Sequence, residues 1–377
     1  MPNELDRSSL PPMDVASRMG RLRAALGEAG CDALLVTSLV NVRYLSGFSG
    51  SAAMLLVLPE GAVLTTDGRY KDQSVEELAA AGVECAVKVG RGSAQLEEVD
   101  AALEGVKRLG FEADAVTVAQ RGRLESELGR VGTGAVSLVA TRGLVEDLRV
   151  VKDEGEVARI ELAAGIADVA LAQVKERLHE GLSEREFALE LDFEMRRRGA
   201  DDVAFETIVA AGPNAALPHA KPSGRRIEPG ELVVIDFGAE LEGYRSDMTR
   251  TLCVGPPTSS QMAELLDAVL MAQRAGVRAV RAGAKGEEVD SACRESLAAA
   301  GYEELLTHGT GHGVGLEIHE APAVGQGSAD ILAPGAVVTV EPGCYVPGTG
   351  GVRIEDTLVV TGNGARALTK STKDTIL

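Results

Sequence analysis

The first 145 residues alternate between two patterns of apolar positions. Apolar residues at helical spacing occupy 19–26, 74–81 and 93–103, whereas short apolar runs lie at 33–36, 53–58, 62–64, 83–87 and 109–111. Spacing by three or four residues predicts helices, and short apolar runs predict strands. We therefore expect an α/β domain with a mostly open sheet over residues 15–148. Residues 1–14 are rich in serine and proline and are expected to form a flexible arm.

The remainder of the chain, 149–377, has a different layout. A long helix is predicted through Ile160 and Val174, with Asp153 or Glu154 near its N-terminus. Further helices are predicted at 183–198, 260–282 and 286–300, and strands at 205–211, 232–253, 336–341 and 352–360. Helices that cover one face of a largely antiparallel sheet form an α+β arrangement, and this is the fold class expected for the second domain.

The stretch 232–253 reads as a hairpin that carries two aspartates. One apolar run ends at Asp236, and the run after the turn contains Asp247. A two-residue loop at 241–242 would pair position 236 with 247, and paired side chains have Cβ atoms about 4.5–5.5 Å apart. Like charges at that distance are destabilising unless a cation neutralises them, so a metal site is one interpretation. Two solvated aspartates on an exposed hairpin are the other, and a turn shifted by one residue would break the pairing.

Charge and composition narrow the functional classes. The 377-residue chain has a formal net charge of −19, which disfavours nucleic acid and anionic membranes as partners because both are bound mainly through Lys and Arg. Solubility explains this charge equally well. The five cysteines are spread along the chain without a CxxC pair, so neither a disulfide framework nor a zinc knuckle is predicted. A cytoplasmic protein fits best, since neither a signal-peptide pattern nor a membrane-spanning apolar run is present.

Histidine placement points to chemistry in the second domain. Of the five histidines, His179 lies in a charged, helical segment and is interpreted as an ordinary surface or core residue. The other four lie in turns marked by glycine or proline: His219, His308, His312 and His319. The last three share a segment with glycine at 309, 311, 313 and 315, a backbone that can approach a ligand closely. The segment fits neither the nucleotide loop GxGxxG nor the zinc motif HExxH, since Ala323 stands where the second histidine should be.

Two more carboxylates complete a candidate set of ligands. Glu341 follows the apolar run 337–340, and the alternation of 352–358 places Arg353, Glu355 and Thr357 on one face. The candidate set offers one nitrogen and four carboxylates and suits Mn, Co, Fe or Zn: Asp236, Asp247, His312, Glu341 and Glu355. One ion needs fewer ligands, so two divalent ions about 3.5–4 Å apart, sharing a water or hydroxide, would use them all.

Seven motifs follow one another along nearly the whole chain. They are NVRYLSGFSGS, TDGRY, FETIVAAGPNAALPHA, IDFGAELEGYRSDMTRT, HGTGHGVGLEIHE, VEPGCY and GVRIEDT. Together they resemble the metal-dependent aminopeptidases and dipeptidases with the pita-bread catalytic fold, in particular the Xaa-Pro aminopeptidase and prolidase branch. The resemblance implies a creatinase-like α/β N-terminal domain followed by a pita-bread catalytic domain.

The resemblance also implies a role for each candidate residue. Asp236 and Asp247 would be the first two metal ligands, His312 the imidazole ligand, and Glu341 and Glu355 the last two, with Asp247 and Glu355 bridging the ions. Glu341 would also contact the nucleophilic water as general base. His219 and His319 would line the substrate pocket, one at the scissile carbonyl and the other at the proline side. His308 and Arg353 are expected at the substrate as well, although Arg353 would also hold the carboxylates in place or form a surface ion pair.

The implied reaction is hydrolysis of the peptide bond whose nitrogen belongs to proline. We expect an Xaa-Pro aminopeptidase that acts on short proline-containing peptides with two divalent metal ions, of which Mn is favoured over Co, Zn and Fe. The alternative is an Xaa-Pro dipeptidase, or prolidase, that acts mainly on dipeptides. A remote alternative is a metal-free relative, either an amidinohydrolase or a binding module. A methionine aminopeptidase would share the ligands, but that branch usually lacks the first domain.

A homodimer is also expected from the resemblance. In such a dimer the first domain of one chain narrows the catalytic cleft of the other. Arg43, Tyr44 and Phe48 would form a rim that faces the partner, unless they pack within their own domain.

Overall fold

The computed structural model describes residues 7–128, 136–179 and 181–376. It separates into two compact units, Met13–Arg149 and a larger one that comprises Val150–Leu377 and the residues before Met13. Of the arm predicted over 1–14, residues 1–6 lie outside the described part. Within the described part of that arm, Pro11 contacts the rest of the larger unit, because its carbonyl accepts a hydrogen bond from Arg159 Nη1 (3.0 Å). Among the described residues, every helix is too short or too polar to cross a membrane.

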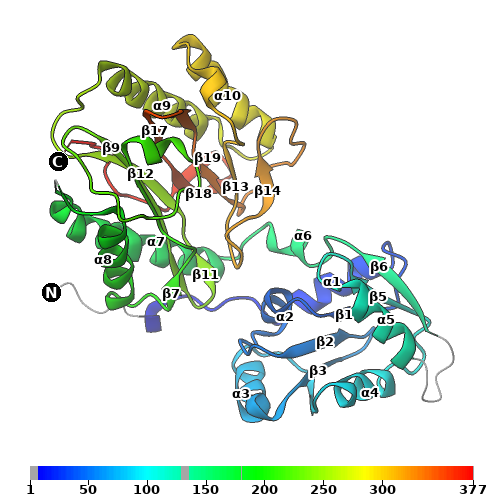
Figure 1. The fold of residues 1–377 in the computed structure, drawn as a ribbon. Coiled ribbons are helices and arrows are strands. Elements are labelled where there is room, and N and C mark those ends of the chain that lie inside the picture. Colours follow the sequence, from blue (N-terminus) through cyan, green and yellow to red (C-terminus); the bar gives the residue numbers. More distant parts are fainter. Residues whose placement is uncertain (1–6, 129–135, 180, 377) are drawn as a thin grey trace. The chain divides into compact units, whose positions relative to one another are not determined.

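The smaller unit is built around one mixed, six-stranded sheet (Figure 1). Its strands are β1 (Ala33–Val36), β2 (Ala53–Val57), β3 (Ala62–Thr66), β4 (Ala86–Val89), β5 (Arg108–Glu112) and β6 (Ser137–Thr141), in the order β4-β3-β2-β1-β5-β6. Strand β1 is antiparallel to β2 and parallel to β5. The helices are α1 (Arg18–Leu26), α2 (Leu39–Ser46), α3 (Lys71–Ala80), α4 (Ser93–Ala101), α5 (Val118–Glu127) and α6 (Glu146–Arg149). The α/β character predicted for this part of the chain is confirmed.

The segment around α2 packs inside the smaller unit. Tyr44 and Phe48 are buried. Tyr44 OH donates to Leu148 O (2.8 Å), and the guanidinium of Arg18 lies 4.2 Å from the centroid of the same ring. The hypothesis that these two rings face a partner is therefore wrong, because their apolar area is already removed from water within their own unit. Arg43 is half-buried.

Four helices flank the strands of the larger unit. They are α7 (Glu154–Val174), α8 (Glu184–Arg197), α9 (Ser260–Ala279) and α10 (Gly286–Ala299). Asp153 Oδ1 accepts a hydrogen bond from Glu156 N (2.8 Å), and Glu156 Oε2 accepts one from Asp153 N (2.9 Å). This capping box explains why α7 begins where it does. The buried faces of α7 and α8 share one apolar core, and those of α9 and α10 share another.

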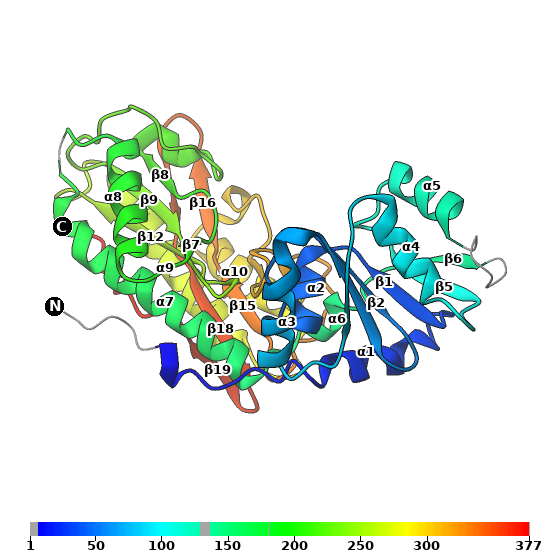
Figure 2. The same ribbon diagram turned by 90° about the horizontal axis from the view of Figure 1, so that it is seen from below.

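The strands of the larger unit form antiparallel sheets. They are β7 (Asp202–Val203), β8 (Ile208–Ala211), β9 (Leu232–Phe237), β10 (Ala239–Leu241), β11 (Tyr244–Arg245), β12 (Met248–Cys253), β13 (Gly311–Gly313), β14 (Glu320–Val324), β15 (Val337–Val340), β16 (Gly343–Val346), β17 (Gly350–Arg353), β18 (Asp356–Thr361) and β19 (Gly364–Ala367). Within the described chain, the sheets that carry the candidate ligands have the orders β12-β9-β8 and β14-β13-β15-β18-β19. Helix α7 lies beside β19 (Figure 2), where Arg366 Nη1 pairs with Glu161 Oε1 (2.7 Å).

The hairpin with the two aspartates differs in register from the prediction. Its turn consists of Glu242 and Gly243, both with positive φ (47° and 80°), and the ladder pairs Asp236 with Thr249. The predicted turn lay one residue earlier and placed Asp247 opposite Asp236, which is wrong. A two-residue turn with positive φ at both positions favours glycine at the second one, and this requirement fixes the register. Asp247 is therefore a diagonal neighbour of Asp236, two residues before Thr249.

The single strand predicted over 352–360 is two strands. Strand β17 ends at Arg353 and pairs with β16, whereas β18 begins at Asp356 and pairs with β15. Glu355 lies in the break between them. The polar face nevertheless continues across the break, because Arg353 Nε and Glu355 Oε2 lie 3.2 and 2.7 Å from the same atom, Thr249 Oγ1.

Candidate metal centre and substrate pocket

Five candidate ligands reach one region from five places in the larger unit. Asp236 lies in β9, Asp247 immediately before β12, His312 in β13, Glu341 immediately after β15, and Glu355 between β17 and β18. One ligand atom each of Asp247, His312 and Glu355 lies within 4.8 Å of the others. The fold thus gathers side chains that are distant in sequence into a group of the size that one metal ion occupies.

His312 is oriented as a metal-binding imidazole. Its Nε2 lies 3.3 Å from Glu341 Oε1 and 3.6 Å from Asp247 Oδ2. The other ring nitrogen, Nδ1, lies 3.0 Å from Gly313 O. A proton on Nδ1 that is donated to this carbonyl leaves the lone pair of Nε2 directed at the carboxylates.

Asp236 is held by a buried arginine. Arg353 Nη2 lies 2.6 Å from Asp236 Oδ2, and Arg353 is only 3% exposed. The surface ion pair considered for Arg353 is therefore wrong. Arg353 contacts Glu355, its expected neighbour, through Thr249. The Thr249 hydroxyl accepts a hydrogen bond from Arg353 Nε (3.2 Å) and donates one to Glu355 Oε2 (2.7 Å).

The cluster contains more negative charge than the protein compensates. Burial raises the pKa of Asp247, and the charges of Glu355 and Asp236 raise it further. Burial and the charges of Glu341 and Asp236 likewise raise the pKa of Glu355. Burial opposes the charge of Glu341, but its hydrogen bond with His312 and the charges of His312, Arg353 and His308 together lower its pKa to about 2. Burial lowers the pKa of His312, but the same hydrogen bond and the negative charges of Glu341 and Asp236 together raise it. Without cations, protons on these groups relieve the repulsion.

Two buried oxygens give an independent sign of a cation site. Asp236 Oδ1 and Glu355 Oε1 are shielded from solvent and have no hydrogen-bond partner among the described residues. A buried carboxylate oxygen without a partner is unfavourable, and a divalent cation would satisfy both. The donor set of one imidazole and several carboxylates suits such a cation. The residues present therefore fit the metal centre that the sequence predicts.

A cavity of about 490 Å³ opens beside these carboxylates. His219, His308, His312 and His319 all line it, so the four histidines singled out by their turns meet in one place. His179 is exposed and lies beyond the end of α7 rather than in a helix.

His308 and His319 are uncharged near neutral pH, because the pKa of each is lowered. The rings of His312 and His319 pack edge to face, with centroids 4.3 Å apart. Burial lowers the pKa of His319, and the neighbouring His312 lowers it further. Burial also lowers the pKa of His308, whose Nε2 lies 2.9 Å from Tyr345 OH and whose Nδ1 lies 2.7 Å from Gly309 O. His319 can therefore donate one N–H without carrying a charge.

The glycines around His312 serve the packing of strands. A Cβ added to Gly311 would lie 2.1 Å from Thr339 O, and one added to Gly313 would lie 2.2 Å from Ala321 O. Strand β13 lies between β14 and β15, and side chains at these positions would prevent that pairing. The interpretation that these glycines let the backbone approach a ligand is corrected: at these two positions they let neighbouring strands approach, which carries His312 to the carboxylates.

The cavity wall also contains residues that the sequence analysis missed. Lys221 and Glu206 both line it, and Lys221 Nζ lies 2.7 Å from Glu206 Oε2. Tyr345 and Thr249 lie behind the cavity lining and hold Arg353 through hydrogen bonds of 2.8 and 3.2 Å. One signal was available for Lys221, which follows His219 by two positions. The others become visible only through tertiary contacts.

Comparison with known proteins agrees with this geometry. Residues 158–362 match metallopeptidase family M24, and residues 18–151 match the creatinase/prolidase N-terminal domain. The chain is 39% identical to an Xaa-Pro dipeptidase of Pyrococcus horikoshii over 366 residues. This alignment covers 97% of the chain and 100% of that relative. A solved Xaa-Pro dipeptidase from Bacillus anthracis has a TM-score of 0.90 at 41% identity, over 96% of this chain and 99% of that chain. A solved X-Pro aminopeptidase from Thermotoga maritima has a TM-score of 0.85 at 34% identity, over 95% and 99%. The predicted family and fold class are confirmed, and the chain belongs to metallopeptidase family M24.

Proposed function

We propose that this metallopeptidase hydrolyses Xaa-Pro dipeptides, the activity of an Xaa-Pro dipeptidase or prolidase. The relative from Pyrococcus horikoshii and the structure from Bacillus anthracis carry that name, and the chain covers nearly all of both. The Thermotoga maritima structure, which is less similar, is named for the aminopeptidase activity that the sequence favoured. The dipeptidase, first considered as the alternative, thus has the stronger support. The observation that carries the proposal is a small cavity, about 490 Å³, lined by histidines and carboxylates that suit a metal centre.

In this proposal Asp236, Asp247, His312, Glu341 and Glu355 would hold two divalent cations. The 4.8 Å group of Asp247, His312 and Glu355 supports it. The oxygens of Asp236 and Glu355 that lack a partner among the described residues also support it. The many carboxylates favour Mn, with Co, Zn and Fe as alternatives. Cations bound there supply positive charge that lowers the pKa of water and polarises the scissile carbonyl.

Glu341 acts as the general base. In the metal-free protein burial opposes its charge, but the hydrogen bond with His312 and the charges of His312, Arg353 and His308 together lower its pKa to about 2, so the carboxylate is ionised. Thr339 Oγ1 lies 3.3 Å from Glu341 Oε1 and helps to orient the group. In the reaction, Glu341 takes the proton of the attacking water and passes it to the proline nitrogen as the C–N bond breaks.

His319 and His219 act on the substrate. The uncharged imidazole of His319 donates a hydrogen bond to the carbonyl oxygen as negative charge develops there. His219 lines the same cavity and contacts the proline side. His308 forms part of the cavity wall, because its Nε2 contacts Tyr345 and its Nδ1 contacts Gly309.

The carboxylate of a dipeptide needs a cation, and we assign this role to Lys221. Among the described residues that line the cavity, Lys221 and Arg353 are the lysine and the arginine. Arg353 donates through Nη2 to Asp236, through Nη1 to Tyr345 and Pro218, and through Nε to Thr249. We therefore assign Arg353 to holding Asp236 rather than to the substrate contact first expected. The Lys221 and Glu206 side chains are 79% and 66% exposed, so a substrate carboxylate can displace Glu206.

Kinetics with Ala-Pro, Ala-Pro-amide and Ala-Pro-Ala test the proposal with Mn-loaded enzyme. A dipeptidase should prefer Ala-Pro by at least about tenfold in kcat/KM, because a hydrogen bond to a charged group contributes about 1.5–3 kcal/mol. Equal or faster cleavage of Ala-Pro-Ala would refute the dipeptidase and favour the aminopeptidase. Lys221→Gln should lower kcat/KM for Ala-Pro by about 10–100-fold and leave the amide within about threefold. The matched variant Glu206→Gln should keep or raise the rate on Ala-Pro.

A further inference from the structure

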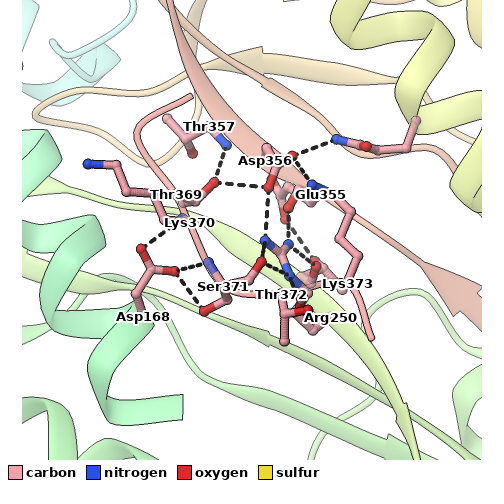
Figure 3. A network of polar contacts seen from close by, with 12 residues as sticks. Asp168, Arg250, Glu355, Asp356, Thr357, Thr369, Lys370, Ser371, Thr372 and Lys373 are labelled. Atoms are coloured by element: carbon pink, nitrogen blue, oxygen red, sulfur yellow. Dashed lines mark hydrogen bonds and ion pairs between the residues drawn. The ribbon is translucent and has the colours of Figure 1, made fainter. Parts of the chain in front are cut away.

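Glu355 is followed by a second buried acid that belongs to a separate polar cluster. Asp356 is buried and lies at the centre of the contacts drawn in Figure 3. Its Oδ1 accepts hydrogen bonds from Arg250 Nη2 (2.9 Å) and Thr369 Oγ1 (3.1 Å), and its Oδ2 accepts from Gln273 Nε2 (2.9 Å) and Lys373 Nζ (2.6 Å). Two of these donors, Thr369 and Lys373, belong to residues 368–376, which we call the C-terminal segment.

Arg250 joins this cluster to the backbone of the candidate metal centre. Its Nη1 donates to Glu355 O and to Thr249 O (2.9 Å). Its Nη2 donates to Ser371 O (2.8 Å) and its Nε to Thr372 O (3.1 Å). One buried guanidinium therefore connects the peptide of Glu355 with two carbonyls of the C-terminal segment.

The C-terminal segment is itself fixed to α7 by Asp168 (Figure 3). Asp168 Oδ2 accepts from Lys370 N (2.8 Å), and Asp168 Oδ1 accepts from Ser371 N (2.6 Å) and Ser371 Oγ (2.7 Å). On the other side, Thr369 Oγ1 accepts from Thr357 N (3.2 Å), and Thr357 Oγ1 donates to Asp247 O (2.7 Å). Hydrogen bonds thus run from Asp168 to the backbone of both Glu355 and Asp247.

We propose that the C-terminal segment is a positioning element of the metal centre, with Asp168 as its anchor and Arg250 and Asp356 as its connection to Glu355. The inference rests on the metal centre proposed above. Glu355 lies in a break between β17 and β18. Its backbone N–H donates to Thr249 O (3.1 Å), and its carbonyl accepts from Arg250 Nη1. Arg250 also donates to Thr249 O, so both backbone contacts of Glu355 involve residues that Arg250 and the C-terminal segment hold in place. Partners of this kind typically change metal affinity 10–100-fold when they are replaced.

The variant Asp168→Asn tests the proposal far from any candidate ligand. Asparagine keeps the size of the side chain but loses the charge that accepts two backbone N–H groups and one hydroxyl. Equilibrium dialysis against Mn(II) should show an apparent Kd raised about 10–100-fold. At saturating Mn(II), KM for Ala-Pro should stay within about threefold of the wild type. Glu161→Gln is the matched control, because Glu161 reaches the C-terminal segment only through the exposed side chain of Lys370 (3.1 Å) and otherwise pairs with the exposed Arg366 (2.7 Å), and it should leave the Kd unchanged.

Each outcome bears on the proposal. A Kd for Asp168→Asn within threefold of the wild type, even with a lower Tm, would overturn it, since Asp168 would then only stabilise the fold. An equal rise in Kd for Glu161→Gln would also overturn it, because loss of surface charge would explain both. Should Asp168→Asn not fold, Lys373→Met removes one donor to Asp356 from a partly exposed side chain and should raise the Kd severalfold. Wild-type protein that binds no Mn(II) would overturn the metal centre itself, which the same dialysis distinguishes.

Discussion

Replacing Arg353 with methionine should show how the protein and bound cations share the charge of Asp236. Arg353 is 3% exposed, and its Nη2 lies 2.6 Å from Asp236 Oδ2. Methionine keeps much of the apolar volume but removes the charge and the hydrogen bonds. Breaking a buried ion pair by removing one partner costs about 3–5 kcal/mol, because the other charge is left buried without compensation. We expect a loss of this size in the free energy of unfolding of the metal-free protein.

The loss should be smaller when metal is bound. Cations at the centre also neutralise Asp236, whose Oδ1 has no hydrogen-bond partner within the described chain. The two losses should therefore differ by about 1 kcal/mol or more, which exceeds the ~0.3–0.5 kcal/mol within which independent effects add. Unfolding and metal binding form one thermodynamic cycle, so Arg353→Met should bind metal more tightly by the same free energy, or about fivefold.

Urea unfolding in EDTA and in saturating Mn(II), at one pH, measures both losses. A chain with two compact units need not unfold in one step, so the transition to compare is the one that shifts with metal. Arg366→Met is the matched control, because Arg366 pairs with Glu161 at the surface (2.7 Å) and should cost under about 1 kcal/mol in either condition. Equal losses for Arg353→Met with and without metal would refute the assignment of Asp236 as a ligand.

Further predictions concern the ligands, the pocket, pH and assembly. Asp247→Asn, His312→Ala and Glu355→Gln should each lose bound metal and activity while keeping the fold, and a full metal content measured by mass spectrometry would remove that residue from the ligand set. His219→Ala and His319→Ala should keep metal but lower kcat/KM for Ala-Pro about 10²–10³-fold; loss of metal would make the residue a ligand instead. In metal-free protein, burial first and neighbouring acids second raise the pKa values of Asp247 and Glu355 above their ordinary 3.8 and 4.5. Stability that is present below those ordinary values is lost as the pH rises through the raised ones. The gap in Tm between metal-loaded and metal-free protein should therefore widen as the pH rises above those ordinary values, and a constant gap would contradict this reasoning. The homodimer stays a prediction, and a monomer mass in light scattering would refute it.

The helices could be predicted where apolar spacing was long and a cap was present. Helix α7 begins after Asp153 and ends at Val174, as the periodicity indicated, because the same residues that repeat in sequence are buried in one core. The six strands of the smaller unit are short, and β6 was not predicted although Leu138, Val139 and Ala140 form an apolar run. Strand pairing required more than periodicity. A single residue in the turn, Gly243, decided the register of the hairpin through its positive φ.

The break at Glu355 could not be predicted for a different reason. The alternation of polar and apolar residues from Val352 to Leu358 is interrupted only at Asp356, so a single strand was expected. The chain changes sheets there because β16 and β15 offer separate edges to the two halves. That choice depends on elements far away in sequence, and no local pattern contains it.

Candidate ligands and their supporting residues differ in how visible they are in sequence. Asp236 and Glu341 each follow a run of apolar strand residues. Burial of an acid at such a position is unfavourable unless a partner compensates its charge, so both residues could be recognised as candidate ligands from the sequence. Nothing local distinguishes Asp168 from a solvated side chain, and Lys221 is marked only by its position two residues after His219. The resemblance led us to expect that Arg353 holds the carboxylates, but beside Glu355 rather than paired with Asp236. The importance of Arg353 and Asp168 comes from what the fold places beside them: Asp236 at 2.6 Å from Arg353, and two backbone amides at 2.6 and 2.8 Å from Asp168. A sequence can therefore disclose the residues that carry uncompensated charge and, through a resemblance, that Arg353 supports them, whereas the partner of Arg353 and the contacts of Asp168 are disclosed only by the structure.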